Sequence, residues 1–377
     1  MALSSAFTAA ELQWPAEPAP AVQRPRLRWL LLAATSWFFT SCGLAAPVES
    51  IAAFPPHLRD TGLPAAGATS TLSARIVSFL PQYPLWSDGA GKRRWLYLPP
   101  GSFIDGSRPD AWEFPIGTRL WKEFSHAGRP VETRFIERAA DGSWRFATYV
   151  WNQDGSDAVL APERGIAALR VPAAPRGRYA VPSRGDCMAC HGGGAVPVLG
   201  VSALQLSGDR DPLAANGRPP SAADIDLRGL VARGWLRGLP AQLVDKPPRI
   251  AARTPLERAA LGYLHGNCSH CHNTSGSQAP VRLTLAQSAA DPASSVRDVL
   301  RSAVEAPSRY RPPGAVGEAQ VVVPGSPQAS VLGVRMRSRH PRVQMPPLAT
   351  DVPDPEGLAL VYRWITHDLP TRKEPKP

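Results

Sequence analysis

The alternation of apolar and polar positions predicts β-strands in the first half of the chain. Apolar side chains recur at every second position in 118–124, 131–136 and 144–151, which is the period of a half-buried strand. Between the last two runs, Asp141-Gly142 is typical of a tight turn. We therefore expect an antiparallel meander within a β-rich domain over residues 76–250.

The apolar pattern changes to helical spacing in the last third of the chain. Thr254-Pro-Leu-Glu257 combines an N-cap residue, a proline at the first helical position and a glutamate at the third, so it predicts a helix over 255–266. A second helix is predicted after Asp354-Pro355-Glu356, and Pro370 ends it. We expect an all-α domain over 251–377, so the expected fold class is α+β.

Composition is that of a soluble globular protein and argues against some functions. Apolar residues make up 44 % and charged residues 19 % of 377 residues, while 42 prolines argue against one long helical bundle. The formal net charge is +11 and arises from Arg more than Lys. Because no dense Lys/Arg run or interleaved aromatic and basic pattern is present, we expect no nucleic-acid binding.

The N-terminus has the pattern of an export signal. Arg24, Arg26 and Arg28 precede the apolar run 29–39, which has the length of a signal-peptide core and is short for a transmembrane span. Small residues stand immediately before Cys42, a pattern that resembles the bacterial lipobox, in which the cysteine is lipidated. Cys42 is also the one cysteine outside the paired motifs described below.

We therefore expect a signal peptide over 1–42, lipidation of Cys42 and a periplasmic protein attached to the outer membrane. Cleavage after Ala45 and plain secretion remain the alternative. Residues 43–75 are rich in Ala, Pro and Gly, and we expect them to act as a tether.

Two Cys-x-x-Cys-His units carry the chemistry. Motif 1 is Cys187-Met-Ala-Cys190-His191, and motif 2 is Cys268-Ser-His-Cys271-His272. In this spacing two cysteines form thioethers to the vinyl groups of a haem, and the following histidine supplies the proximal iron ligand. A redox dithiol or a structural zinc site would not need a histidine after both pairs, so we expect two covalently attached haems c.

The segment around motif 2 resembles a class I cytochrome c. The similarity lies in the helix before the motif, the closing helix, and the run Val343-Gln-Met345-Pro-Pro347 between them. The resemblance implies that Met345 is the distal ligand of haem 2, with Met336 and His340 as alternatives. It also implies that Gly262 lies at a helix crossing with Tyr362 or Trp364. A thioether is a soft ligand that favours ferrous iron.

Much of the chain, from about residue 51 to 368, resembles a family of bacterial dihaem c-type cytochrome lipoproteins. The resemblance is carried by both motifs and by short runs in the strand-rich part, namely 85–90, 114–118, 122–124, 131–134 and 149–151. It implies a dihaem cytochrome more firmly than any reaction. We expect periplasmic electron transfer with a redox protein or dehydrogenase, whose surface is acidic because this chain is basic.

The distal ligand of haem 1 stays open at this point. His126 and His57 are the other histidines before residue 250, and the third possibility is that no residue binds there. An open haem 1 would support a different function, namely a haem enzyme that acts on peroxide or a nitrogen oxide with haem 2 as an electron relay. A gas or redox sensor is a third possibility.

Overall fold

The computed structural model describes residues 53–63, 75–275, 279, 281–314 and 317–369. These residues belong to one compact unit. The expected signal peptide and Cys42 lie outside the described residues, as does part of the expected tether. No helix within the described ranges has the length and apolar character needed to cross a membrane.

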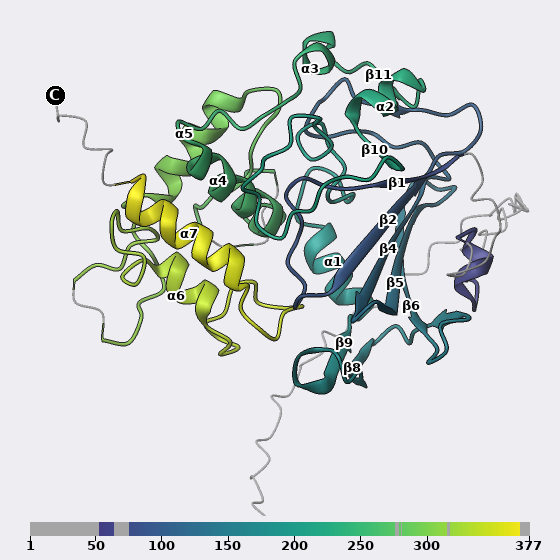
Figure 1. The fold of residues 1–377 in the computed structure, drawn as a ribbon, viewed down its shortest axis with the longest axis horizontal. Coiled ribbons are helices and arrows are strands. Elements are labelled where there is room, and N and C mark those ends of the chain that lie inside the picture. The colour runs from purple at the N-terminus through teal and green to yellow at the C-terminus, as the bar shows by residue number, and fades with distance from the viewer. Residues whose placement is uncertain (1–52, 64–74, 276–278, 280, 315–316, 370–377) are drawn as a thin grey trace, which may run out of the picture. The chain divides into compact units, whose positions relative to one another are not determined.

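A seven-stranded sheet forms the centre of the fold (Figure 1). The strand order is β10-β1-β2-β4-β5-β6-β7, and all neighbours are antiparallel except β10 and β1. The strands are β1 (Ile76–Phe79), β2 (Gly91–Tyr97), β4 (Arg119–His126), β5 (Arg129–Arg138), β6 (Trp144–Trp151), β7 (Ala158–Leu160) and β10 (Asp224–Ile225). Strands β4, β5 and β6 confirm the three strands predicted from the alternation.

Smaller elements surround this sheet. Two further strand pairs join β3 (Ile104–Asp105) to β11 (Leu236–Arg237), and β8 (Ile166–Arg170) to β9 (Arg178–Val181). The helices are η1 (Leu58–Thr61), η2 (Pro175–Gly177), α1 (Arg184–His191), α2 (Leu227–Ala232), α3 (Ala241–Asp245), α4 (Pro255–Cys268), α5 (Pro292–Ala303), α6 (Val331–Arg337) and α7 (Pro355–His367).

The two faces of the sheet pack against different parts of the chain. Trp121, Phe135 and Tyr149 are buried on one face, where Leu58 and Leu63 of the segment 53–63 cover them. The other face carries apolar side chains that join the core of the helical region. Because neighbouring residues of a strand point to opposite faces, one alternating sequence supplies both layers.

Helices α4 and α7 begin where the sequence predicts. The Thr254 hydroxyl accepts a hydrogen bond from the Glu257 amide at 2.9 Å, and the Asp354 carboxylate accepts one from the Gly357 amide at 3.0 Å. Each side chain satisfies an amide that has no partner within its helix. The Glu257 carboxylate does not complete the predicted capping box. It accepts hydrogen bonds from Arg253 instead.

The expected all-α C-terminal domain is wrong. The chain is a mixed α/β structure in which one buried core includes sheet residues such as Leu96 and Leu120 together with Leu261 of α4 and Trp364 of α7. Short extended pairs also occur near the C-terminus, between Val304 and Val322 for example. The helices therefore do not close a core of their own, and Figure 1 shows α4 to α7 grouped beside the sheet.

Tyr83 gives the physical reason for this shared core. Its buried ring lies against α4 at Gly262, where a Cβ atom would overlap the ring. The crossing expected between Gly262 and the last helix is therefore occupied by a residue from the strand-rich part. Helices α4 and α7 meet elsewhere, where the ring of Tyr263 lies against Gly357.

Gly262→Ala should destabilise the protein by about 1–3 kcal/mol, although alanine is normally the better helix former, because the added methyl collides with a fixed ring. Tyr83 cannot swing away easily, since its hydroxyl donates to Asp211 at 3.1 Å. Chemical denaturation measures the change. Gly185→Ala in α1 is the control, because its Cβ meets no atom closer than 3.6 Å. A Gly262→Ala variant as stable as the native protein would contradict this packing.

Candidate functional site

Helix α1 carries motif 1. Ser183 and Asp186 form a capping box at its start: the Ser183 hydroxyl accepts from the Asp186 amide at 3.1 Å, and the Asp186 carboxylate accepts from the Ser183 amide at 2.9 Å. Cys187 and Cys190 lie one helical turn apart, so both sulfurs lie along one side of the helix. Within the described residues, no disulfide joins any of the four motif cysteines.

His191 has the tautomer that a metal ligand needs. Its Nδ1 lies 2.6 Å from the Pro197 carbonyl oxygen, which can only accept, so Nδ1 carries the proton and Nε2 has a free lone pair. Burial lowers the pKa of His191 to about 4, and the imidazole is therefore neutral at neutral pH. The Phe146 ring, 5.0 Å away between centroids, packs beside it. The hydrogen bond to Pro197 therefore fixes the orientation of the His191 ring. Histidines that bind a metal commonly donate their second ring N–H to a carbonyl in this way.

Motif 2 follows directly from the end of α4. The His272 amide donates to the Cys268 carbonyl at 2.9 Å, which folds the motif into a tight turn. Asn267 holds this turn against the strand-rich part: its Oδ1 accepts from the Trp86 amide at 2.7 Å, and its Nδ2 donates to the Tyr263 carbonyl at 3.0 Å. Burial lowers the pKa of His272, so this imidazole is also held in the neutral form.

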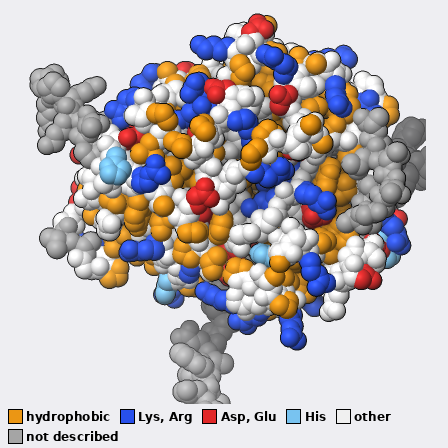
Figure 2. All heavy atoms as spheres, in the orientation of Figure 1, with side chains coloured by type: hydrophobic (Ala, Val, Ile, Leu, Met, Phe, Trp, Pro, Cys, Tyr) orange, Lys and Arg blue, Asp and Glu red, His pale blue; other side chains and the backbone are white. Residues whose placement is uncertain are grey.

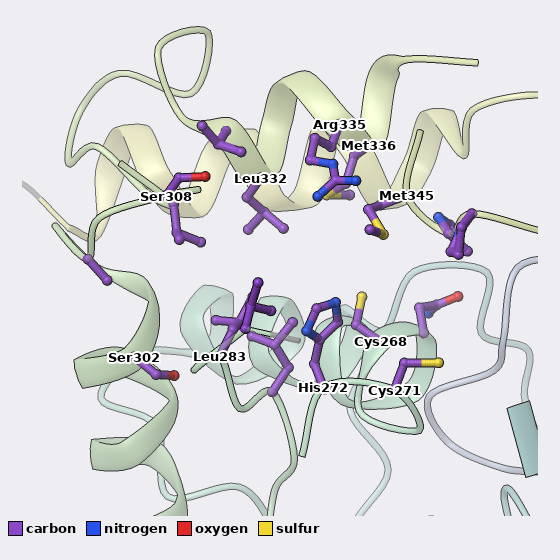
Figure 3. A pocket seen from close by; sticks show the side chains of 18 of the residues that line it. Cys268, Cys271, His272, Leu283, Ser302, Ser308, Leu332, Arg335, Met336 and Met345 are labelled. Atoms are coloured by element: carbon purple, nitrogen blue, oxygen red, sulfur yellow. The ribbon is translucent and has the colours of Figure 1, made fainter. Parts of the chain in front are cut away.

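A cavity of about 520 Å³ opens beside motif 2. This volume lies within the range of about 300–1,000 Å³ that is usual for small-molecule and cofactor sites. Figure 3 shows Cys268, Cys271 and His272 on one side of the cavity, and Met345 on the opposite side. The structure thus brings together the residues that the sequence predicts for haem 2, from segments 73 residues apart (345 − 272).

The two alternatives to Met345 differ in position. Met336 on α6 also lines the cavity, but it is buried in the main core at 8 % exposure. His340 is exposed and is not among the residues that line the cavity. The position of Met345 is set by α6, because its amide donates to the Arg335 carbonyl at 3.0 Å. The identity of the iron ligand stays a prediction.

The two motifs are in direct contact. Asn273, immediately after motif 2, donates through Nδ2 to the Gly193 carbonyl at 2.7 Å, two residues after motif 1. The Cys271 sulfur lies 3.9 Å from the Ala189 carbonyl oxygen inside motif 1. Two sites 80 residues apart in sequence therefore share one location.

Neither histidine considered for the distal side of haem 1 is well placed. The register puts Leu120 of β4 in the same row as Phe146, and His126 follows six residues later, about 20 Å along the strand. Two ligands of one iron face each other across a single ion, so this separation argues against His126 as the partner of His191. His57 instead lies at strand β7, with Nδ1 2.7 Å from Asp157.

Several residues that build the site were not identified from the sequence. The sequence could have predicted the capping box of α1, because a serine followed three residues later by an acidic residue is a known signal for the start of a helix. Asn267 and Asn273 flank motif 2, but no local pattern shows that their amides bond to distant backbone groups.

Comparisons of the chain with protein families, with curated proteins and with solved structures find no match. Among the described residues, no group of three or more His, Cys, Asp or Glu side chains is placed to hold a metal ion. A haem c site draws one histidine from its motif, so it does not form such a group.

Asn273→Ala should destabilise the protein by about 1–3 kcal/mol, because the buried Gly193 carbonyl loses its donor when the bridge between the motifs is removed. Denaturant unfolding measures the change, and hydrogen exchange should show faster exchange around 189–193. The control is Asn152→Ala, whose amide makes an exposed bond to Ser156, with an expected change below about 0.5 kcal/mol. Equal effects of both substitutions would contradict a special role for the bridge.

Proposed function

We propose that this protein is an exported dihaem c-type cytochrome that transfers electrons in the periplasm. The observation that carries the proposal is the cavity beside motif 2, which has two thiols and a neutral imidazole on one side and the Met345 thioether on the other. A haem needs this set: two thioether attachments and two axial ligands on opposite faces of the iron.

The walls of the cavity also fit a haem. Leu283, Leu285, Val321 and Leu332 offer apolar surface for a porphyrin. The charged residues of the lining are mostly cationic, and they match the two carboxylates that a haem carries: Arg282, Arg301, Arg309, Arg335 and Arg339, with Asp354 as the acid. When bound, haem iron supplies one-electron oxidation and reduction.

The protein's own residues have three roles in this proposal. Cys187, Cys190, Cys268 and Cys271 hold the two groups covalently, and His191 and His272 supply proximal nitrogens that burial keeps unprotonated. Met345 supplies a soft distal ligand, which favours the reduced state. The Asn273 bridge keeps both attachment sites together, which favours transfer between them over transfer to separate partners.

The surface and the N-terminus define the proposed partners. Lys and Arg side chains, blue in Figure 2, outnumber Asp and Glu on the face shown and are spread over it. Such a surface favours an acidic redox protein or dehydrogenase and raises the rate of encounter at low salt. Lipidation at Cys42 would attach the protein to the outer membrane.

Met345→Ala should convert haem 2 from a low-spin to a high-spin form, because its distal position loses its ligand. Electron paramagnetic resonance and optical spectra of the oxidised protein measure the spin states. Met336→Leu is the control and should leave both spectra unchanged, since it keeps an apolar side chain of similar size. Absence of covalent haem in the native protein would refute the proposed function. Unchanged spin states in Met345→Ala would refute only the ligand assignment.

Cys42→Ser should release the protein from the membrane fraction, because a serine at this position cannot carry the thioether-linked lipid. Fractionation of cells that produce either form measures the distribution. Haem content should stay the same in both, since the four motif cysteines are unchanged. Equal release of the native protein and the variant would show that cleavage occurs elsewhere and that no lipid anchor forms.

A further inference from the structure

A row of cations crosses the sheet beside motif 1. Arg94 of β2 pairs directly with Lys122 of β4, and Lys122 pairs directly with Arg134 of β5. Residues paired in this way point to the same face, so three positive side chains stand next to one another. Lys92, two positions before Arg94, lies on the same face. We call these four residues the cation row.

Like charges opposite one another destabilise a sheet, and burial increases the penalty. Arg94 is only 6 % exposed, and Lys122 is half-buried. Within the described ranges, neither side chain forms a hydrogen bond or an ion pair. The Lys122 ammonium lies 4.8 Å from the centre of the Phe124 ring, which compensates part of one charge.

The carboxylates near the cation row already pair with other groups, although Oε2 of Glu132 is buried without a hydrogen-bond partner. Glu132 bonds to Arg134 at 2.7 Å and accepts from the Tyr179 hydroxyl at 2.9 Å. Asp224 accepts from the Ser221 amide and hydroxyl at 2.8 Å and pairs with Arg218. Burial and the neighbouring cations lower the pKa of Lys122 well below its usual range, as expected for a charge without a counter-ion. Within the described residues, Arg94, Lys122 and Lys92 therefore lack paired negative charges, and only Arg134 has a carboxylate partner.

The position of the row relative to motif 1 indicates what supplies those charges. Phe146 of β6 contacts His191 of motif 1, and Thr148, two residues further on the same face, pairs with Arg134, so this end of the row lies beside motif 1. From Arg134 to Arg94 the row crosses two inter-strand spacings, about 10 Å. This distance is comparable to the width of a porphyrin. In a haem the vinyl groups and the two propionate carboxylates lie on opposite edges.

We propose that Arg94 and Lys122, with Lys92 beside them, bind the propionate carboxylates of the haem attached to Cys187 and Cys190. The assignment rests on the proposed dihaem function. A haem held in this way would have its vinyl edge at α1 and its propionate edge directed across β4 toward β2. Two carboxylates would supply partners for Arg94 and Lys122, and arginine can bind a carboxylate in bidentate geometry.

The test measures the midpoint potentials of both haems against pH in three full-length variants. In the native protein the paired propionates stay ionised, so the potential of haem 1 should be nearly independent of pH between about 5 and 9. In Arg94→Gln and Lys122→Met, the loss of a positive charge favours the oxidised iron and should lower the midpoint potential of haem 1. A tenfold shift of the equilibrium between oxidised and reduced haem corresponds to about 59 mV. The propionate pKa should also rise, so that the potential falls as pH rises.

Arg93→Gln is the matched control. Arg93 is adjacent to Arg94 but points to the opposite face, where it pairs with Glu123 at 2.8 Å, so its loss should leave the pH dependence unchanged. The other titratable groups around the row are common to every variant, and they cancel in the comparison: Glu132, Tyr179, His270, Asp88, Asp224 and Asp354.

Three results would overturn the assignment. If the midpoint potentials stay unchanged in both Arg94→Gln and Lys122→Met, and the protein carries two haems, then the cation row does not bind the propionates. The proposed dihaem function would still stand. Saturable binding of nitrite by the native protein that is lost in Arg94→Gln, without any change in the pH dependence, would assign the row to a small oxyanion from solution. Absence of covalent haem would refute the proposed function and the assignment together. Lys122→Met guards against a folding failure, because it replaces a partly buried charge by an apolar chain.

Discussion

The contact between Tyr83 and the backbone of α4 is the constraint on which the rest of the structure depends. Gly262 and Gly266 leave room for Tyr83, and no larger residue fits at either position without displacing it. This contact joins the strand-rich part to the helix that ends in motif 2, and it places Asn267 where it can bond to Trp86. The location of one candidate haem site is thus set by residues about 180 positions earlier in the chain.

The same close packing explains why the two motifs meet. Once α4 is fixed against the strand-rich part, the turn after Cys268 faces the end of α1, and Asn273 reaches the Gly193 carbonyl. Helix α1 in turn lies beside β6, where Phe146 contacts His191. Cationic side chains border both sites, along the sheet beside motif 1 and around the cavity beside motif 2.

Local features of the fold were predictable from the sequence, and long-range contacts were not. Strands such as 144–151 and the capped start at Thr254 follow from side-chain period and from capping chemistry, which act within a few residues. The prediction of a separate all-α domain was wrong. Helical periodicity shows that a helix has a buried face, but it does not show which part of the chain covers that face. Cross-strand neighbours such as Arg94 and Lys122 become visible only once the register is known.

The capping box of α1 has a consequence for the order in which the chain can assemble. Its hydrogen bonds join residues only three apart, so motif 1 can take its helical form as soon as those residues are synthesised. The far wall of the cavity at motif 2 instead includes Met345, which is made 73 residues after His272 (345 − 272). The two sides of this cavity can therefore come together only after the chain has folded back over this separation, later than helix α1 can form.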